Sequence, residues 1–300
     1  MRDKFIIGII AFVTIALIGV NIFFQFHRTE NQILNIHVLD QWINQPFDET
    51  HTLSTENGDV DLKIHYYSDY KDLLSADKTS NAIFIFDAVA YLEHKSDFEN
   101  FSILALRPKQ VSLVINPQNS EISSIKDLKG PVLGVSSKAS DEYLFRSVID
   151  KEGLVGIALD EVTFTDPVEK IEMLTDGYIE YAFLESPYLE IAVEKGAGVL
   201  YNFDNCYDAL IVSKELDEKI FAELPKLIRT YNENMKAYSG VLLKETSIKN
   251  IESYRDKLRT LMYPFEKPDV EVINKLATYF FATNRIDEKY TFAELVIEGF

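Results

Sequence analysis

The candidate functional residues of this chain are ligand-binding residues rather than catalytic ones, because the usual signatures of catalysis are missing from the sequence. The five histidines, at positions 27, 37, 51, 65 and 94, do not have the spacing of a metal site. Neither a Gly-x-Ser-x-Gly motif nor a Gly-x-x-x-x-Gly-Lys motif occurs. The single cysteine, Cys206, has no histidine or lysine beside it in sequence, which favours a structural role. We therefore predict a chain that is not an enzyme and needs no cofactor and no metal.

One group of candidate ligand contacts consists of serines at the start of a predicted helix. Ser136 and Ser137 follow an apolar run and Ser140 opens the helix, where exposed backbone N–H groups can hold an anion. Asp141 and Glu142 already occupy the first helical turn and interact favourably with the helix dipole, so a bound anion would gain less. Ser140 either caps the helix or shares in ligand contact.

A second group follows the apolar run at 180–184. Glu185 and Ser186 lie at the end of this predicted strand, and Pro187 suits the first turn of the next helix. A carboxylate here favours a ligand portion that is cationic or rich in hydrogen-bond donors. The alternative for Glu185 is a favourable charge at a helix N-terminus.

Aromatic and acidic candidates lie near other predicted strand ends. Trp42, the sole tryptophan, either stacks on a ligand or packs in the core. Phe86 and Asp87 end a buried run, and the phenyl ring either fills part of a pocket or stacks on a flat ligand. Tyr188 and Tyr207 are further candidates of the same kind.

The elements that must position these residues alternate along the chain. Patterns of apolar residues predict strands in the first part at 34–39, 61–66, 81–86, 102–106 and 110–116. Arg107-Pro108-Lys109 separates the last two. From 131 to 201 strands and helices alternate, which indicates parallel strands with helices on both faces. A return strand at 207–213 is followed by mostly helical sequence, with amphipathic stretches at 244–263 and 268–281.

Composition is that of a globular protein with a sizeable core, since 47% of the 300 residues are hydrophobic and 26% are charged. The formal net charge is −18. Lysines and arginines do not alternate with aromatic residues along any face, so we expect no nucleic-acid partner.

The amino terminus contains a long apolar segment. Phe5 to Phe24 is an uncharged run that can span a hydrocarbon core of about 30 Å, and Arg2 and Lys4 precede it. Small residues for cleavage do not follow the run, so we favour an uncleaved anchor over a cleaved secretory signal. The positive charges hold the start in the cytoplasm, which predicts that the remaining chain lies at the extracytoplasmic face of the membrane.

Two segments resemble a known family. Ile125-Lys-Asp-Leu-Lys-Gly130 and Gly177-Tyr-Ile-Glu-Tyr-Ala182, with Pro187 after the second, are similar to patterns in the extracytoplasmic substrate-binding proteins of ABC importers. The branch concerned takes up taurine, alkanesulfonates and thiamine precursors. The resemblance covers roughly Ser102 to Val212. It implies an α/β, two-lobed type II periplasmic-binding-protein fold with two crossing strands and the ligand in the cleft between the lobes.

This resemblance predicts the domain organisation. Residues 1–33 form the membrane anchor or signal and a linker, residues 34–109 and 208–300 form lobe 1, and residues 110–207 form lobe 2. A ligand that touches both lobes binds the closed form better and shifts the population toward the shape that docks on a permease.

The implied function is capture of a small organic ligand, which is sulfonate-, carboxylate- or thiamine-precursor-like, and its delivery to an ABC permease and its ATPase. Three alternatives stay open: a membrane-anchored ligand sensor, an enzyme on the same fold, and a protein whose cleft no longer binds. One enzyme branch of this fold makes the thiamine pyrimidine with a cysteine-rich motif, which a chain with Cys206 alone does not match.

Overall fold

The computed structural model describes ten segments of the chain: 32–39, 52–55, 58–67, 69–119, 121–128, 132–136, 140–154, 160–186, 188–238 and 264–297. Of residues 140, 142, 204, 205 and 235–238, it describes the backbone alone. The predicted anchor Phe5 to Phe24, the candidates Trp42 and Ser137, and the predicted helix at 244–263 lie outside these segments. Among the helices within them, none has the length and apolar character needed to cross a membrane.

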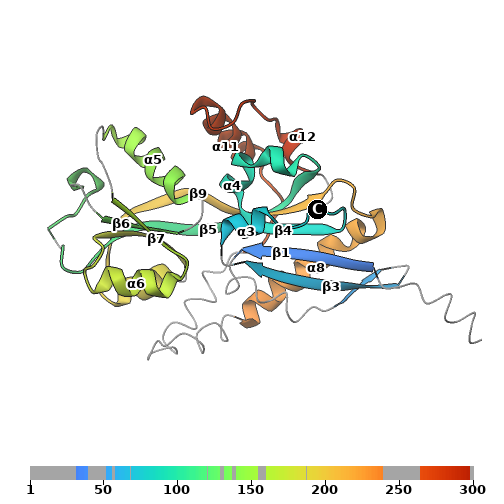
Figure 1. Cartoon of the computed structure of the whole chain (residues 1–300), viewed down its shortest axis with the longest axis horizontal. Helices are drawn as coiled ribbons and strands as arrows, with labels where there is room; N and C mark the ends of the chain where they lie inside the picture. The colour runs from blue at the N-terminus through green and yellow to red at the C-terminus, as the bar shows by residue number, and fades with distance from the viewer. Residues whose placement is uncertain are drawn as a thin grey trace, which may run out of the picture.

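The described strands form one mixed sheet in the order β2-β3-β1-β4-β9-β5-β8-β6-β7 (Figure 1). The strands are β1 Gln32–Leu39, β2 Thr52–Thr55, β3 Gly58–Tyr67, β4 Ala82–Asp87, β5 Phe101–Ile115, β6 Val132–Ser136, β7 Asp160–Phe164, β8 Tyr181–Glu185 and β9 Gly198–Ser213. The helices are α3 Tyr70–Leu74, α4 Ala88–Glu93, α5 Ser140–Glu152, α6 Pro167–Thr175, α7 Tyr188–Glu194, α8 Glu218–Tyr238, α11 Val270–Ala282 and α12 Phe292–Leu295, with short 3-10 turns at Lys95–Phe98 and Ile125–Asp127.

The strands β5 and β9 run through both halves of the sheet. β4 pairs with β9 at one end, β8 pairs with β5 at the other, and β5 pairs with β9 along most of its length. We call β2, β3, β1 and β4 with their helices the first half, and β8, β6 and β7 with theirs the second half. Figure 1 shows the two halves at opposite ends of the two long strands. The division into lobes at 34–109 plus 208–300 and at 110–207 stays a prediction.

Each long strand was expected as two shorter ones, because Arg107-Pro108-Lys109 interrupts the apolar pattern of β5. In the structure Pro108 pairs with Tyr207 of β9, and β8 joins the other edge of β5 only from Val111 onward. Among the described strands, none lies beside Pro108 on that edge, so its missing N–H removes no hydrogen bond to a described strand there. Proline is therefore tolerated in β5, at a position before β8 joins this edge of the strand.

The parallel arrangement predicted for the strands between residues 131 and 201 is confirmed for β6, β7 and β8, and the first half also contains parallel pairs. β1 pairs in parallel with β3 and β4, and β6 pairs in parallel with β7 and β8. The antiparallel strand β2 was not predicted, since Thr52–Thr55 is short and mostly polar.

Helices cover both faces of each half, which the alternation of elements predicted for residues 131–201. In the first half, alternate residues of β1 such as Leu34 and Ile36 pack against α8, while the opposite face packs against α4 and α11. In the second half, α6 and α7 cover one face and α5 covers the other. The carboxyl ends of β4, β6 and β8 then lead directly toward α4, α5 and α7.

Candidate ligand-binding site

A buried group of charged side chains lies where the sheet passes from its first half to its second. Lys109 Nζ lies 2.6 Å from Asp87 Oδ2, 3.1 Å from Asp208 Oδ1 and 3.6 Å from Glu185 Oε2. The three carboxylates come from β4, β9 and β8. We call these residues, together with Arg107, the charged cluster. Burial lowers the pKa of Lys109, but Asp208, Asp87 and Glu185 outweigh it and raise this pKa well above its ordinary value, so the amine stays an ammonium.

Arg107 fixes the charged cluster to the first half. Its Nη2 lies 2.6 Å from Asp208 Oδ2, and its Nη1 donates a hydrogen bond of 2.5 Å to the Tyr231 hydroxyl of α8. The guanidinium also lies 4.9 Å from the centre of the Phe265 ring, within the range of a cation–π contact. Asp208 thus accepts from both cations of the cluster.

Asp87 joins the end of β4 to the start of α4. As the N-cap residue it accepts hydrogen bonds at Oδ1 from the backbone N–H groups of Val89, at 2.9 Å, and Ala90, at 3.3 Å. Its other oxygen faces Lys109, and the residue is only 3% exposed. The N–H groups at the start of α4 are therefore already bound by a carboxylate of the chain.

The corresponding junction in the second half, between β6 and α5, is also occupied by the chain's own groups. The backbone N–H of Ser136 donates to Asp141 Oδ2 at 2.6 Å, and Lys170 Nζ of α6 donates to Ser136 Oγ at 2.7 Å. Asp141 and Lys170 are both buried. Gly134 makes room for Ile179 beside α6, because a Cβ at that position would lie 2.5 Å from Ile179 Cδ1 and 3.4 Å from Lys170 Cγ.

The third junction, between β8 and α7, carries two further polar candidates. Glu185 ends β8 and faces Lys109. Ser186 Oγ donates a hydrogen bond of 2.7 Å to Glu190 Oε1 in the first turn of α7. Within the described segments, Glu190 Oε2 is a buried oxygen without a hydrogen-bond partner. This junction therefore holds acceptor atoms close to the charged cluster.

Residues 56–237 match the family model described as NMT1/THI5 like. The chain belongs to this family. No curated protein is significantly similar to the chain in sequence. The charged cluster thus lies within the matched region of an NMT1/THI5-like protein.

Solved structures share the fold of this NMT1/THI5-like protein. The periplasmic aliphatic sulphonate binding protein SsuA from Escherichia coli superposes with a TM-score of 0.67 at 13% identity, over 89% of this chain and 98% of that one. The ligand-binding component of an ABC-type import system from Staphylococcus aureus, with zinc bound, has a TM-score of 0.65 at 9% identity, covering 89% and 97%. PhnD1 from Prochlorococcus marinus, in complex with methylphosphonate, gives 0.58 at 13%, covering 85% and 99%. The mixed α/β sheet with its helices therefore fits the periplasmic-binding-protein fold.

The structure brings some of the predicted contacts of this NMT1/THI5-like protein together and buries others. Asp87 and Glu185 meet at Lys109. Phe86 is 2% exposed, and its ring centre lies 5.5 Å from that of Phe98 in the core of the first half. Tyr188 is buried in the second half. Tyr207 is half-buried against the first, and Ser140 is the first residue of α5. Their roles in ligand binding stay predictions.

Sequence reasoning missed the three cations at these junctions, Arg107, Lys109 and Lys170. Arg107 and Lys109 lie in the predicted break between strands, and Lys170 was not considered as a site residue. A charge next to Pro108 inside an otherwise apolar strand was the available signal for the first two. Cys206 is buried, and burial is the main reason that its pKa is raised to about 12, which supports the predicted structural role. The described residues hold no group of three or more potential metal ligands.

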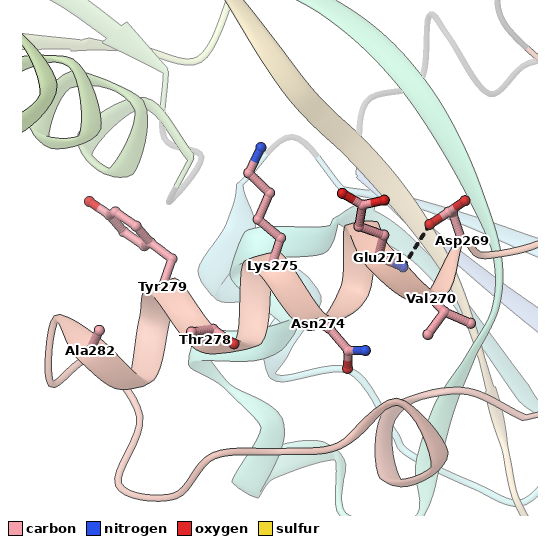
Figure 2. A pocket seen from close by; sticks show the side chains of 8 residues that line it. All are labelled: Asp269, Val270, Glu271, Asn274, Lys275, Thr278, Tyr279 and Ala282. Carbon is pink, nitrogen blue, oxygen red and sulfur yellow. Dashed lines mark hydrogen bonds between the residues drawn. The ribbon is translucent and has the colours of Figure 1, made fainter.

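A separate hollow lies on the surface along α11 (Figure 2). It is lined by Asp269, Val270, Glu271, Asn274, Lys275, Thr278, Tyr279 and Ala282. All these residues belong to one helix or its N-cap, whereas the charged cluster joins strands from both halves of the sheet. The charged cluster is therefore the stronger candidate for a site that depends on two lobes.

Proposed function

We propose that this NMT1/THI5-like protein is the extracytoplasmic solute-binding component of an ABC importer, which captures a small organic ligand between two lobes and delivers it to a permease and its ATPase. The observation that carries the proposal is the convergence of Asp87 and Glu185, from the two halves of the sheet, on Lys109. Ligands of open α/β sheets bind beyond the carboxyl ends of strands, which is where both carboxylates lie. The shared fold with binding proteins of import systems supports the same function.

The charges at the junctions favour one of the expected ligand classes. A sulfonate or carboxylate needs free donors, but Asp87 already accepts from the N–H groups that start α4, and Asp141 accepts from Ser136 N–H. Carboxylates also surround Lys109. Glu190 Oε2 is a buried acceptor without a described donor. We therefore propose a thiamine-precursor-like ligand, planar, rich in hydrogen-bond donors and without negative charge.

The proposed lining of the site combines both lobes. Lobe 1 contributes aromatic faces and one carboxylate, and lobe 2 contributes hydroxyl groups and a second carboxylate. The residues are Trp42, Phe86 and Asp87 in lobe 1 and Ser136, Ser137, Ser140, Glu185, Ser186, Tyr188 and Tyr207 in lobe 2.

We also propose that Phe5 to Phe24 anchors the protein at the extracytoplasmic face of the membrane. The length of the apolar run and the absence of small residues for cleavage support this proposal. Amino-terminal sequencing of protein extracted from membranes tests it. A soluble form that starts beyond residue 24 would contradict it.

Native mass spectrometry of the detergent-extracted full chain is the direct test of the proposed function. We expect a retained small molecule without net negative charge. Calorimetry with the identified compound then compares the parent with Ser136→Ala, and Ser54→Ala, on β2 at the far edge of the sheet, serves as control. A retained sulfonate would contradict the ligand class only. Turnover of the retained compound would contradict the inference that the protein is not an enzyme.

A further inference from the structure

We propose that Lys109 is a positioning residue that sets how the two halves of the ligand site face each other before a ligand binds, an inference that rests on the proposed binding function. A ligand in a two-lobed protein stabilises one arrangement by touching both lobes. Here an ammonium of the chain itself touches both sides, since Lys109 contacts Asp87 of the first half and Glu185 of the second.

The burial of Lys109 makes these contacts effective. Exposed ion pairs contribute little because water and salt screen them, but the Lys109 side chain is only 9% exposed. A buried ammonium that lost its carboxylates would be strongly unfavourable. Movement of the second half that carried Glu185 away from Lys109 would therefore be resisted.

A second contact joins the same two halves by packing rather than by charge. Tyr143 of α5 stacks on Phe280 of α11, with ring centres 5.0 Å apart and planes 26° apart. It also meets Tyr279 edge-on at 4.9 Å. Figure 2 shows Tyr279 projecting from α11, beside the hollow along that helix. The two halves are thus joined both at the crossing strands and at the outer helices.

Glu185→Gln is the variant that separates positioning from folding. It keeps the size of the side chain and removes only the charge that reaches Lys109 from the second half. Asp87 and Asp208 remain within 3.1 Å of the ammonium to neutralise it. Lys109→Met is a harsher variant, because it leaves several carboxylates facing an apolar side chain.

The experiment measures the distance between the halves in the full-length protein in detergent. Spin labels are placed at Lys219→Cys on α8 and Glu172→Cys on α6, both exposed, in a Cys206→Ser background. Without ligand, we expect one narrow distance distribution in the parent. In Glu185→Gln we expect the ratio of a second, displaced population to the first to rise about tenfold, as the loss of a charge-assisted contact implies.

Glu93→Gln is the matched control. Glu93 of α4 pairs with Arg285, and both residues belong to the first half. Its loss removes a carboxylate from an ion pair of similar burial without touching the connection between halves. We expect its distance distribution to equal that of the parent. A broad distribution in the parent, or an unchanged one in a folded Glu185→Gln protein, would overturn the proposal.

Ligand binding is recorded on the same samples by native mass spectrometry, so the two proposals fail separately. If Glu185→Gln displaces the halves but no sample retains or binds a small molecule, Lys109 keeps its positioning role and the binding function is wrong. If the parent retains a compound and Glu185→Gln binds it equally well with unchanged distances, the binding function stands and the role of Lys109 is wrong. We expect weaker binding by about tenfold in Glu185→Gln.

Discussion

The two junctions at which β4 enters α4 and β6 enters α5 have the same topology but different means of support. At the first junction Asp87 caps α4 and pairs with Lys109, directly after a phenylalanine that lies in the core. At the second junction the carboxylate belongs to Asp141, inside α5, and it reaches back to the N–H of Ser136. The first junction is held by packing and buried charge, and the second by hydrogen bonds.

From this difference we expect the first half to determine stability and the second half to determine recognition. Around the first junction, Phe86 contacts Tyr70, Tyr91 and Phe98 in a continuous aromatic core. Around the second, the half-buried Ser136 places polar atoms near the surface. We therefore expect substitutions at the first junction to unfold the protein and those at the second to alter ligand binding.

The largest effect is expected for Asp87→Ala. The substitution removes an N-cap and leaves Lys109 with one carboxylate fewer, so we expect a loss of about 3 to 5 kcal/mol in the free energy of unfolding. Urea denaturation measures it. Asp269→Ala is the control, because Asp269 caps α11 through two N–H groups but is exposed.

The control should lose only about 1 kcal/mol, the usual contribution of a cap. Equal losses in Asp87→Ala and Asp269→Ala would show that the ion pair with Lys109 adds nothing. Buried charge would then not explain a difference in stability between the two junctions.

A smaller effect is expected for Gly134→Ala in the second half. The added Cβ would lie 2.5 Å from Ile179 Cδ1 and 3.4 Å from the stem of Lys170, so the buried Ile179 side chain must move and the packing beside Lys170 changes. Overpacking of this kind costs about 1 to 3 kcal/mol. Urea denaturation measures the loss, and calorimetry should show weaker ligand binding because Lys170 moves relative to Ser136. Unchanged ligand binding in this variant would show that Lys170 does not contribute to the binding site.

Much of this arrangement could be predicted from the sequence because it depends on local patterns. The buried run 82–86, the turn at Gly177 and the helix start after Asp166 each follow from neighbouring residues, and the structure has β4, α6 and β8 at these places. The continuity of β5 and β9 could not be predicted, since it depends on which strand lies beside Pro108. The pairing of β5 with β9 joins segments that lie far apart in the sequence.

The sequence predicted that Asp87 and Glu185 lie near each other but not that a buried cation joins them. Strand ends identified Asp87, Ser136 and Glu185 as neighbours of a common edge. Lys109 and Lys170 come from a crossing strand and from a helix, and no local pattern connects them with those residues. Because carboxylates of the chain already surround Lys109 and accept from the N–H groups at the two junctions, we propose a ligand without negative charge among the expected classes.

The histidines offer a pH test of the same comparison, since all five precede residue 100 and none lies in 110–207. His37 stacks between His65 and Phe84. Burial, with a smaller contribution from the nearby His65, lowers the pKa of His37 from 6.5 to about 4. The unfolded chain then binds more protons between these values, so stability falls as the pH falls through this window.

We expect the parent to lose about 1 kcal/mol between pH 6.5 and pH 5.5 through His37, measured by urea denaturation at both values. His37→Phe keeps a ring in the stack and should lose less over that range. His94→Gln, at an exposed side chain, should behave as the parent does. An equal loss in His37→Phe and the parent would contradict the assignment.

The smallest effect on stability is expected for Ser136→Ala, and it is the sharpest test of recognition at the second junction. The substitution removes the hydroxyl that accepts from Lys170 Nζ but leaves the backbone N–H of residue 136 free to bind Asp141. A single hydrogen bond contributes about 0.5 to 1.5 kcal/mol net, so the urea midpoint should move only slightly. Ligand affinity should fall by a similar free energy, because Lys170 loses its hydrogen bond to the Ser136 hydroxyl at the carboxyl end of β6. Ser112→Ala removes another buried hydroxyl, which donates to Asn202 between β5 and β9, and should leave affinity unchanged while changing stability comparably. Equal affinities in both variants and the parent would mean that the second junction supports the fold alone, and recognition would then have to be sought among the aromatic residues of the first.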